Sequence, residues 1–255
     1  MTAGEGSVFL VDKPAGLTSF AVVQRVRRLL GIKKVGHAGT LDPFATGLLI
    51  VCAGRSATRH IEQFMDGGKT YLARLQLGVE TETLDPEGAI TATAAVPVLD
   101  QATIDACLDA HAGRQFQVPP SFSAVKHQGK PLYAYARLGV HIDKEARPVV
   151  IELLVCHGYD SARAQLDIEV RCSRGTYIRV LAADIGRSLG CGAHLISLRR
   201  TTSGPFTVQR SLPGEVLCDA TGREQLLAGR MAIDEALRLV GPASVLAGAG
   251  GRPAV

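Results

Sequence analysis

The chain has 255 residues, of which 46% are hydrophobic and 20% are charged, and its formal net charge at pH 7 is +4. This composition excludes a disordered chain, and the length allows one large domain or one and a half. The sequence has no apolar run long enough to cross a membrane and no export leader at its start, which predicts a cytoplasmic protein. The six cysteines have neither CxxC nor zinc-ligand spacing, so we expect reduced thiols and no metal. The small net charge does not by itself indicate a nucleic-acid partner.

The N-terminal half is predicted to alternate short strands and helices. We expect a strand over 7–12 and then a helix that is capped by Ser19 and ends at Gly31, because apolar residues recur at helical spacing between them. The next predicted elements, in chain order, are a strand over 48–53, a helix through Ile61 and Phe64, a strand over 70–77 and a helix over 102–112. We predict an irregular loop over 113–130, where Pro, Ser and Gly are frequent.

The C-terminal half contains the clearest strand pattern of the sequence. From Ala164 to Cys172, apolar and polar residues alternate strictly, which predicts a half-buried, antiparallel strand. A turn over 173–175 follows, and then a helix that ends at Gly190. Strands and helices therefore occur in blocks with hairpins among them, which favours an α+β fold with a mixed sheet over a doubly wound fold.

Residues 36–49, GHAGTLDPFATGLL, form the first candidate site. Glycines permit backbone conformations that other residues avoid, and the following proline biases Asp42 towards an extended conformation, so this loop can present one carboxylate to a ligand. The alternative is an ordinary surface turn started by Asp-Pro. The same tripeptide recurs at 84–86, where a hairpin turn accounts for Asp85. The first copy differs in its glycines, in His37 and in the basic residues that precede it.

A second candidate site lies at a predicted strand-to-helix junction, residues 171–186. Arg174, Tyr177 and Arg179 fall where free backbone N–H groups and the helix dipole favour anions. An arginine at such a place can keep a catalytic carboxylate ionised or hold a phosphate. The alternative is an ordinary helix start with solvated side chains.

One further segment suits an RNA-binding protein, and one tyrosine has an ordinary structural explanation. Residues 119–139 mix Lys126 and other basic residues with tyrosines, which suits the backbone and bases of RNA, although a short helix and a hairpin explain the segment almost as well. Tyr71 lies on a predicted strand, where most tyrosines are packing residues with a solvated hydroxyl.

Segments spread over residues 7–204 together resemble the bacterial tRNA pseudouridine synthase B (TruB) family. Each segment alone is a weak match, but they occur in the family's order. They are VDKPAGLTS, VGHAGTLDPFATGLL, GGKTYLARLQLG with ETETLDPEG, PPSFSAVKHQGKPLYAYARLG, and RCSRGTYIRVLAADIGRSLGCGAHLISLRRT. The resemblance implies a pseudouridine synthase fold, with a mixed, mostly antiparallel central sheet flanked by helices and loops that form an RNA-binding cleft.

The resemblance also implies an activity. Family members convert uridine 55 in the T-loop of tRNA to its C-glycoside isomer, without cofactor or metal, after the nucleotide has left the base stack. We therefore expect a monomeric enzyme whose partner is tRNA, bound through the T-arm. A catalytic domain is expected over 1–240, and 241–255 would be a remnant of the family's PUA-type RNA-binding domain.

The same resemblance implies roles for individual residues. Asp42 matches the catalytic aspartate, which either adds to C1′ or stabilises the positive centre while a C2′ proton leaves, and Arg179 matches its arginine partner. Tyr71 matches the tyrosine that stacks on the target base and is a candidate to take the C5 proton. Asp85 matches an aspartate near the cleft whose role stays open. The remaining matches are expected to bind substrate: Tyr177 and Leu198 in the uridine pocket, His37 at the opened T-loop, and Lys13, Lys69, Lys126 and Arg174 at phosphates.

Two other classes of protein share parts of this pattern. A non-catalytic tRNA-binding or tRNA-folding factor would keep the cleft but would be free to lose Asp42, which occurs here together with Tyr71, Tyr177 and Arg179. A base-removing glycosylase would also flip a nucleotide and use a carboxylate, but it would leave an abasic site.

Overall fold

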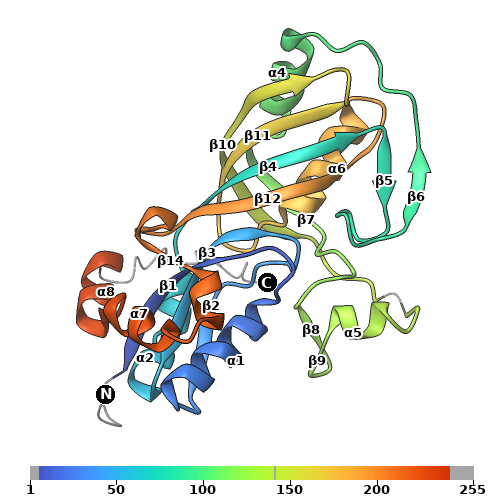
Figure 1. The fold of residues 1–255 in the computed structure, drawn as a ribbon. Coiled ribbons are helices and arrows are strands. Elements are labelled where there is room, and N and C mark those ends of the chain that lie inside the picture. The colour runs from blue at the N-terminus through green and yellow to red at the C-terminus, as the bar shows by residue number, and fades with distance from the viewer. Residues whose placement is uncertain (1–5, 141, 242–255) are drawn as a thin grey trace, which may run out of the picture.

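One large mixed sheet organises the protein (Figure 1). The structure is a computed structural model that describes residues 6–140 and 142–241. Within these residues, eleven strands join the sheet, and its main path runs in the order β14-β1-β3-β12-β4-β11-β10-β7. The strands of this path are β1 (Ser7–Lys13), β3 (Thr46–Ala53), β4 (Lys69–Leu77), β7 (Gly113–Gln117), β10 (Arg147–Asp160), β11 (Gln165–Cys172), β12 (Ala193–Ser203) and β14 (Leu212–Pro213).

Shorter strands complete the architecture. Beside the main path, β2 (Val35–Ala38) pairs with β3, β13 (Phe206–Thr207) with β12, and β15 (Met231–Ala232) with β1. Two small hairpins stand apart from the sheet: β5 (Val79–Thr81) with β6 (Ile90–Thr93), and β8 (Lys126–His127) with β9 (Lys130–Pro131). The pairs of β1 with β14 and of β3 with β12 are parallel, and the other pairs in the described residues are antiparallel. The predicted α+β fold with a mixed, mostly antiparallel sheet is confirmed.

Helices cover the two halves of the sheet separately. They are α1 (Ser19–Leu30), α2 (Arg55–Thr58), α3 (Ile61–Met65), α4 (Gln101–Ala110), α5 (Leu132–Ala136), α6 (Ile178–Ser188), α7 (Gly222–Ala228) and α8 (Ile233–Val240), with 3-10 turns over Val208–Arg210 and Gly214–Cys218. Helix α6 packs on β12 and α4 on β10, whereas α1 packs on β2 and β3 (Figure 1). The half that contains β4 and β11 therefore has one apolar core, and the half that contains β1 and β3 has two, one on each face.

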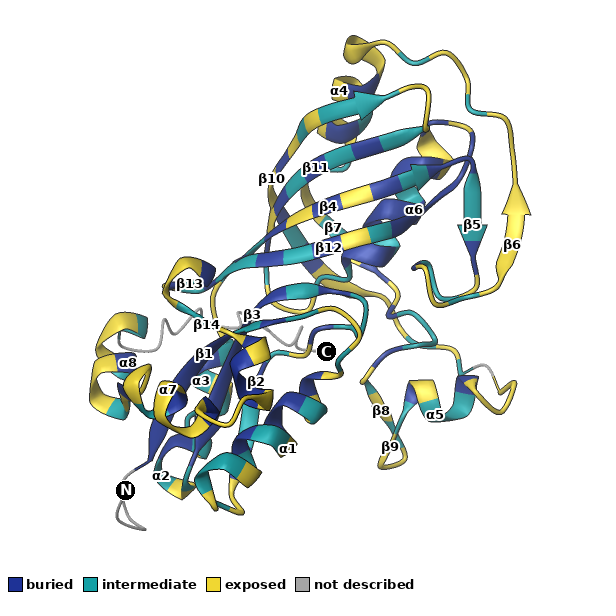
Figure 2. Cartoon of the chain, viewed as in Figure 1, coloured by how far each residue is buried: buried dark blue, intermediate teal, exposed yellow. Residues whose placement is uncertain are grey.

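Burial explains the two kinds of strand sequence. Strands β1 and β3 are buried along nearly their whole length, because helices cover both of their faces (Figure 2). Strands β4 and β11 instead alternate buried and solvent-facing residues, because only one face packs against α6 and its neighbours. The alternation predicted from Ala164 to Cys172 is therefore confirmed over Gln165–Cys172, and both neighbours of β11 are antiparallel.

The two halves of the sheet meet where β3 runs parallel to β12. Thr46 pairs with Arg199, and Gly47 pairs with Arg200. Gly47 has a φ of +101°, and a Cβ at this position would collide with the Arg200 carbonyl oxygen, so this close approach requires glycine. The segment just before β3, which contains Asp42, is thereby held against β12.

One local prediction near the N-terminus is wrong in detail. The cap of α1 is Thr18 rather than Ser19: Thr18 has an extended backbone, and its hydroxyl accepts a hydrogen bond from the Ala21 N–H. The helix predicted through Ile61 and Phe64 is confirmed as α3, and a separate short helix, α2, precedes it.

Two predicted loops contain strands. The segment 36–49 includes most of β2 and the start of β3, so that only 39–45 is irregular. The segment 113–130 begins with β7, an edge strand that pairs with β10 although its residues do not alternate clearly.

The end of the chain remains a prediction. Apart from Gly241, residues 241–255 lie outside the described residues, and nothing tests the boundary expected at residue 240. In the described residues, no helix has both the length and the apolar character required to span a membrane.

Candidate active site

The Asp42 carboxylate is carried by residues 39–45, a short loop between β2 and β3. Ser19 holds the middle of this loop, because its buried hydroxyl accepts a hydrogen bond from the Leu41 N–H at 2.9 Å and contacts the Leu41 carbonyl oxygen at 3.0 Å. Lys13 holds the next turn, since its Nζ donates to the Pro43 carbonyl at 3.1 Å. The backbone on both sides of Asp42 is thus tied to β1 and α1.

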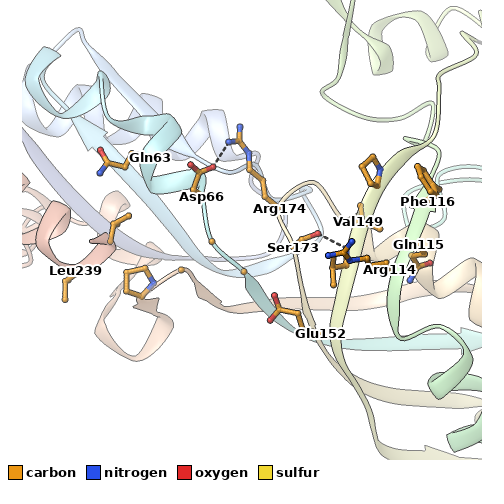
Figure 3. A pocket seen from close by; sticks show the side chains of 17 residues that line it. Gln63, Asp66, Arg114, Gln115, Phe116, Val149, Glu152, Ser173, Arg174 and Leu239 are labelled. Atoms are coloured by element: carbon orange, nitrogen blue, oxygen red, sulfur yellow. Dashed lines mark hydrogen bonds and ion pairs between the residues drawn. The ribbon is translucent and has the colours of Figure 1, made fainter. Parts of the chain in front are cut away.

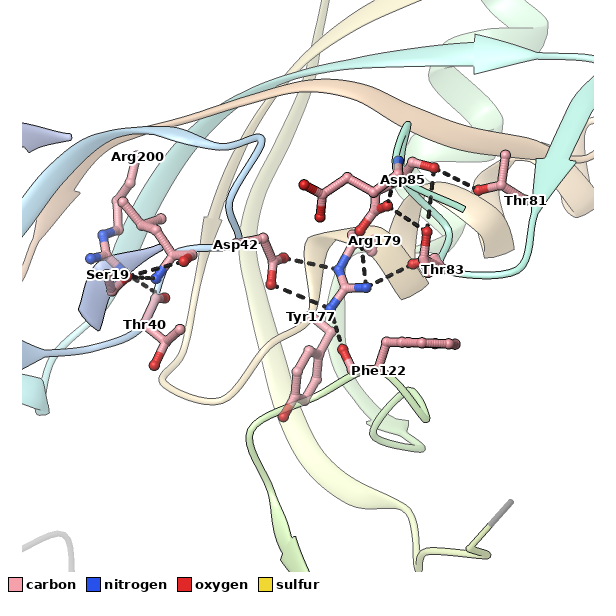
Figure 4. Close-up of polar contacts among 12 residues, drawn as sticks. Ser19, Thr40, Asp42, Thr81, Thr83, Asp85, Phe122, Tyr177, Arg179 and Arg200 are labelled. Carbon is pink, nitrogen blue, oxygen red and sulfur yellow. Dashed lines mark hydrogen bonds and ion pairs between the residues drawn. The ribbon is translucent and has the colours of Figure 1, made fainter. Parts of the chain in front are cut away.

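Arg200 of β12 holds the beginning of the same loop. Its Nη2 donates to the Gly39 carbonyl at 3.0 Å and its Nη1 contacts the Thr40 carbonyl at 3.4 Å, while its Nε donates to the Leu48 carbonyl at 2.8 Å. Figure 4 shows Arg200 and Ser19 together on this side of Asp42. The position of Asp42 is therefore set by three separate elements.

Arg179 of α6 lies between two aspartates (Figure 4). Its Nε is 2.9 Å from Asp42 Oδ2, and its Nη2 is 3.4 Å from Asp42 Oδ1. On its other side, Nη1 is 3.2 Å from Asp85 Oδ2 and donates to the Thr83 carbonyl at 2.7 Å. Nη2 also donates to the Phe122 carbonyl at 2.7 Å, so all five N–H groups of the guanidinium have acceptors.

The two aspartates differ in exposure. The side chain of Asp42 is 33% exposed, whereas those of Arg179 and Asp85 are 4% and 5% exposed. Burial raises the pKa of Asp42 above its ordinary value, and the positive charge of Arg179 opposes this rise. Asp42 is therefore the one carboxylate of this network that a ligand can reach.

Asp42 opens into a pocket of about 320 Å³, near the lower end of the usual range for small-molecule sites. Tyr71 of β4 lines the pocket with a buried side chain, and burial raises the pKa of its phenol. The pocket brings together seven of the predicted site residues: Asp42, Lys69, Tyr71, Arg174, Tyr177, Arg179 and Leu198. Residues far apart in the chain thus form one chemical site.

The other three predicted residues lie outside this pocket. His37 is half-buried on β2, and burial lowers the pKa of its imidazole, so the ring is neutral at pH 7. Lys126 is exposed on β8, in the hairpin that stands apart from the sheet. Lys13 lies beneath the Asp42 loop.

The phosphate contact predicted for Lys13 does not fit the structure. Lys13 is fully buried, and its three N–H donors meet the carbonyls of Pro14, Leu17 and Pro43. Burial lowers the pKa of Lys13 to about 8. Its role is to hold the loop, because no donor remains for a phosphate.

Lys69 and Arg174 differ from Lys13 in facing the pocket. Burial also lowers the pKa of Lys69 to about 8, but its Nζ donates to two carbonyls, those of Met65 and Gly67, which leaves one N–H free of these contacts. Arg174 is half exposed and pairs with Glu62 at 2.6 Å and with Asp66 at 2.9 Å. Arg174 remains a candidate to contact a phosphate at the surface, and Lys69, which is buried, remains one only through its third N–H group.

A larger cavity of about 1130 Å³ shares Arg174 with the Asp42 pocket (Figure 3). Its lining includes Arg114, Phe116 and Glu152, and it contains none of Asp42, Tyr71 and Arg179. Size alone would therefore select a cavity without these three residues, whereas the ionisable groups favour the smaller one.

Three site residues were missed or only partly understood from the sequence. Ser19 was interpreted as a helix cap, and Arg200 was not singled out, although it lies within one of the matched motifs. The hairpin interpretation of Asp85 is correct about the turn between β5 and β6 but incomplete, since the carboxylate contacts Arg179. A pairing of β12 with β3 could not be read from either strand alone, so the sequence did not indicate what Arg200 contacts.

Comparisons with known proteins agree with this geometry. The sequence profile for "TruB family pseudouridylate synthase (N terminal domain)" matches residues 27–178, and that for "tRNA pseudouridylate synthase B C-terminal domain" matches residues 179–238. The tRNA pseudouridine synthase B of Desulfotalea psychrophila is 54% identical over 242 residues, which cover 94% of this chain and 97% of that protein. That of Aromatoleum aromaticum is 51% identical over 205 residues, which cover 80% of this chain and 65% of that protein.

Solved structures show the same fold. The chain is similar to one in the crystal structure of a Cbf5-Nop10-Gar1 complex, with a TM-score of 0.70 and 26% identity over 91% of this chain and 62% of that one. It also resembles a chain of the archaeal box H/ACA sRNP Nop10-Cbf5 complex, with a TM-score of 0.65, 27% identity and coverage of 90% and 60%. The chain thus spans about three fifths of these structural relatives.

The fold and the matched sequence profiles define a pseudouridine synthase, an isomerase that acts on RNA uridines. One profile covers more than half of the chain, and the first relative is more than half identical over nearly its whole length. The chain therefore belongs to the TruB family of pseudouridylate synthases, as the resemblance predicted.

Proposed function

We propose that this enzyme isomerises a uridine of tRNA to pseudouridine, that the target is uridine 55 in the T-arm, and that Asp42 is the reactive group. One observation carries the proposal: the Asp42 carboxylate is held by Arg179 and by its anchored loop, yet opens into a pocket that also contains Tyr71. The names of the curated relatives support tRNA as the substrate.

The reaction requires a nucleotide that has left the base stack. The bond between N1 and C1′ breaks, the base turns, and a bond forms between C5 and C1′. A pocket of about 320 Å³ suits one nucleoside rather than a stacked helix. The RNA backbone must therefore stay outside the pocket; of the two pocket-lining cations expected at phosphates, Arg174 is exposed and Lys69 is buried.

Asp42 and Arg179 act on the sugar. An ionised carboxylate can add to C1′, or it can stabilise the positive charge at C1′ while a proton leaves C2′. The bidentate contact with Arg179 orients the carboxylate and favours its charged form.

Tyr71, Tyr177 and Leu198 act on the base. All three line the pocket, where an aromatic ring provides a stacking surface for uracil. We assign to Tyr71 the removal of the C5 proton after the new bond has formed. Outside the pocket, His37 and Lys126 would contact the opened T-loop and the RNA backbone. The enzyme is expected to work as a cytoplasmic monomer.

Release of tritium from tRNA labelled at C5 of uridine tests the proposal. The wild type is expected to release label equivalent to one uridine per tRNA, Asp42→Asn none, and the matched variant Asp160→Asn, at the far end of β10, the wild-type amount. Wild-type protein that releases no label would contradict the enzyme assignment, and an abasic product would indicate a glycosylase. Faster refolding of tRNA without label release would indicate a folding factor instead.

A further inference from the structure

Arg200 is the largest fully buried side chain of the described residues, with 1% of its surface exposed. A buried cation is costly unless it is hydrogen-bonded or paired. The guanidinium contacts three carbonyl oxygens, those of Gly39, Thr40 and Leu48, and within the described residues it forms no ion pair with a carboxylate. Its positive charge is therefore solvated by backbone dipoles but not neutralised.

Arg200 lines the pocket and has no carboxylate partner among the described residues. Arg200 and Tyr71 are partners across β12 and β4, and both line the pocket that contains Asp42. Burial raises the pKa of the Tyr71 phenol, and the nearby positive charge of Arg200 opposes that rise. The adjacent Arg199 has a different environment, because it pairs with Asp12 at 2.6 Å.

We propose that Arg200 is a positioning residue that stabilises the phenolate of Tyr71 during proton transfer from C5. The inference rests on the proposed function, and it assigns a chemical task to a side chain that would otherwise only join β3 to β12. Through its contacts with Gly39 and Thr40, the same guanidinium also fixes the loop of Asp42. One buried cation thus holds the loop of Asp42 and lies across the strand pair from Tyr71.

The proton balance of the isomerisation explains why a phenolate is needed. After C5 has bonded to C1′, the C5–H bond breaks, and its electron pair restores the double bond between C5 and C6. The proton passes to the Tyr71 oxygen, while N1, released from the sugar, gains one proton. The net change is one proton moved from C5 to N1, so the phenol can give its proton to N1 and regain one from C5. A buried phenolate between these steps requires a nearby positive charge.

The experiment compares single-turnover rates on tRNA that carries hydrogen or deuterium at C5 of its uridines. The variants are Arg200→Gln, which is neutral but can still donate to carbonyls, Arg200→Lys, which keeps the charge, and Arg199→Met as the matched control. Thermal melting of each variant monitors folding, and Arg200→Met serves as the neutral variant if Arg200→Gln does not melt cooperatively.

Arg200→Gln is expected to lower the single-turnover rate by about 100-fold, the usual effect of removing one preorganised electrostatic contact. Its hydrogen-to-deuterium rate ratio should exceed that of the wild type, because removal of the C5 proton becomes slower. Arg200→Lys should keep a ratio close to the wild type, and Arg199→Met should change neither quantity.

A rate loss in Arg200→Gln with an unchanged isotope ratio would overturn the inference, because it would show that Arg200 acts only through the fold or the Asp42 loop. Wild-type protein that forms no pseudouridine would contradict the proposed function, and this inference with it. Normal turnover by the wild type separates the two failures.

Discussion

The tripeptide Leu-Asp-Pro occurs twice, and both aspartates contact the same arginine. Asp42 and Asp85 lie on opposite sides of Arg179, at 2.9 and 3.2 Å (Figure 4). Asp85 is enclosed, since its carboxylate also accepts hydrogen bonds from the Thr83 hydroxyl and the Glu87 N–H. Asp42 instead accepts from Arg179 and leaves a third of its side chain open to the pocket.

The difference shows that the structural surroundings of each aspartate, and not the shared tripeptide, determine its role. Asp42 is positioned through its backbone, which frees the carboxylate for substrate, whereas the carboxylate of Asp85 is used to hold Arg179. We therefore expect loss of Asp42 to abolish the reaction, and loss of Asp85 to displace Arg179, which orients Asp42. The following changes separate these two roles, from the largest effect to the smallest.

Replacing Asp42 by asparagine should have the largest effect. The amide cannot carry the charge needed at C1′, so kcat should fall by at least about 1,000-fold. Binding of tRNA should change little, because Asp42 is one group in a larger contact surface. Single-turnover kinetics and a filter-binding titration measure the two quantities, and a weaker Kd with unchanged kcat would assign Asp42 to binding.

Replacing Asp85 by asparagine should have an intermediate effect. Arg179 would lose a buried partner, so kcat should fall by about 10- to 100-fold, and the protein should lose about 3 kcal/mol of stability. Denaturant unfolding beside the rate assay checks both. An Asp85→Asn enzyme as inactive as Asp42→Asn would mean that the two carboxylates act as one unit.

The acidic limb of the pH–rate profile should lie at lower pH in Asp85→Asn than in the wild type. The negative charge of Asp85 contributes to the raised pKa of Asp42, while Arg179 and Lys13 lower it. Activity requires ionised Asp42 and is lost as the pH falls through its pKa. Removing the charge of Asp85 lowers that pKa, so the acidic limb should shift to lower pH although the maximum rate is reduced. A shift to higher pH would contradict the assignment of this limb to Asp42.

Substitutions of Ser19 and Thr18, which are adjacent at the start of α1, should have the smallest effects. Ser19→Ala removes the contacts with Leu41 and should lower kcat by about 10-fold, with a stability cost of about 1–2 kcal/mol. Thr18→Ala removes the helix cap and should cost about 1 kcal/mol but leave kcat unchanged. Melting curves and rates of both variants test the difference, and equal losses of kcat would refute the anchoring role of Ser19.

Local patterns predicted the elements with strong periodicity. Helix α1 and strand β11 follow from the spacing of their apolar residues, and Gly31 ends the helix as expected. Strands β2 and β7 were missed, because their pairing with β3 and β10 depends on long-range contacts that leave little trace in four or five residues.

The site was predicted in part through the family resemblance. Asp42, Tyr71 and Arg179 do meet in one pocket, although residues 42 and 179 alone gave only a loop and a helix start. The phosphate contact predicted for Lys13 does not fit, because its three N–H donors are taken up by backbone carbonyls. The sequence around residue 13 does not reveal these contacts. The contact of Asp85 with Arg179 was not predicted, because a hairpin turn explains this residue locally.

The central claim is that only Asp42 reacts, although two aspartates contact Arg179. Single-turnover release of tritium by Asp42→Asn and Asp85→Asn, followed to completion on the same tRNA, tests it most directly. The account predicts no release by Asp42→Asn and slow but complete release by Asp85→Asn. Complete release by Asp42→Asn, with none by Asp85→Asn, would contradict it.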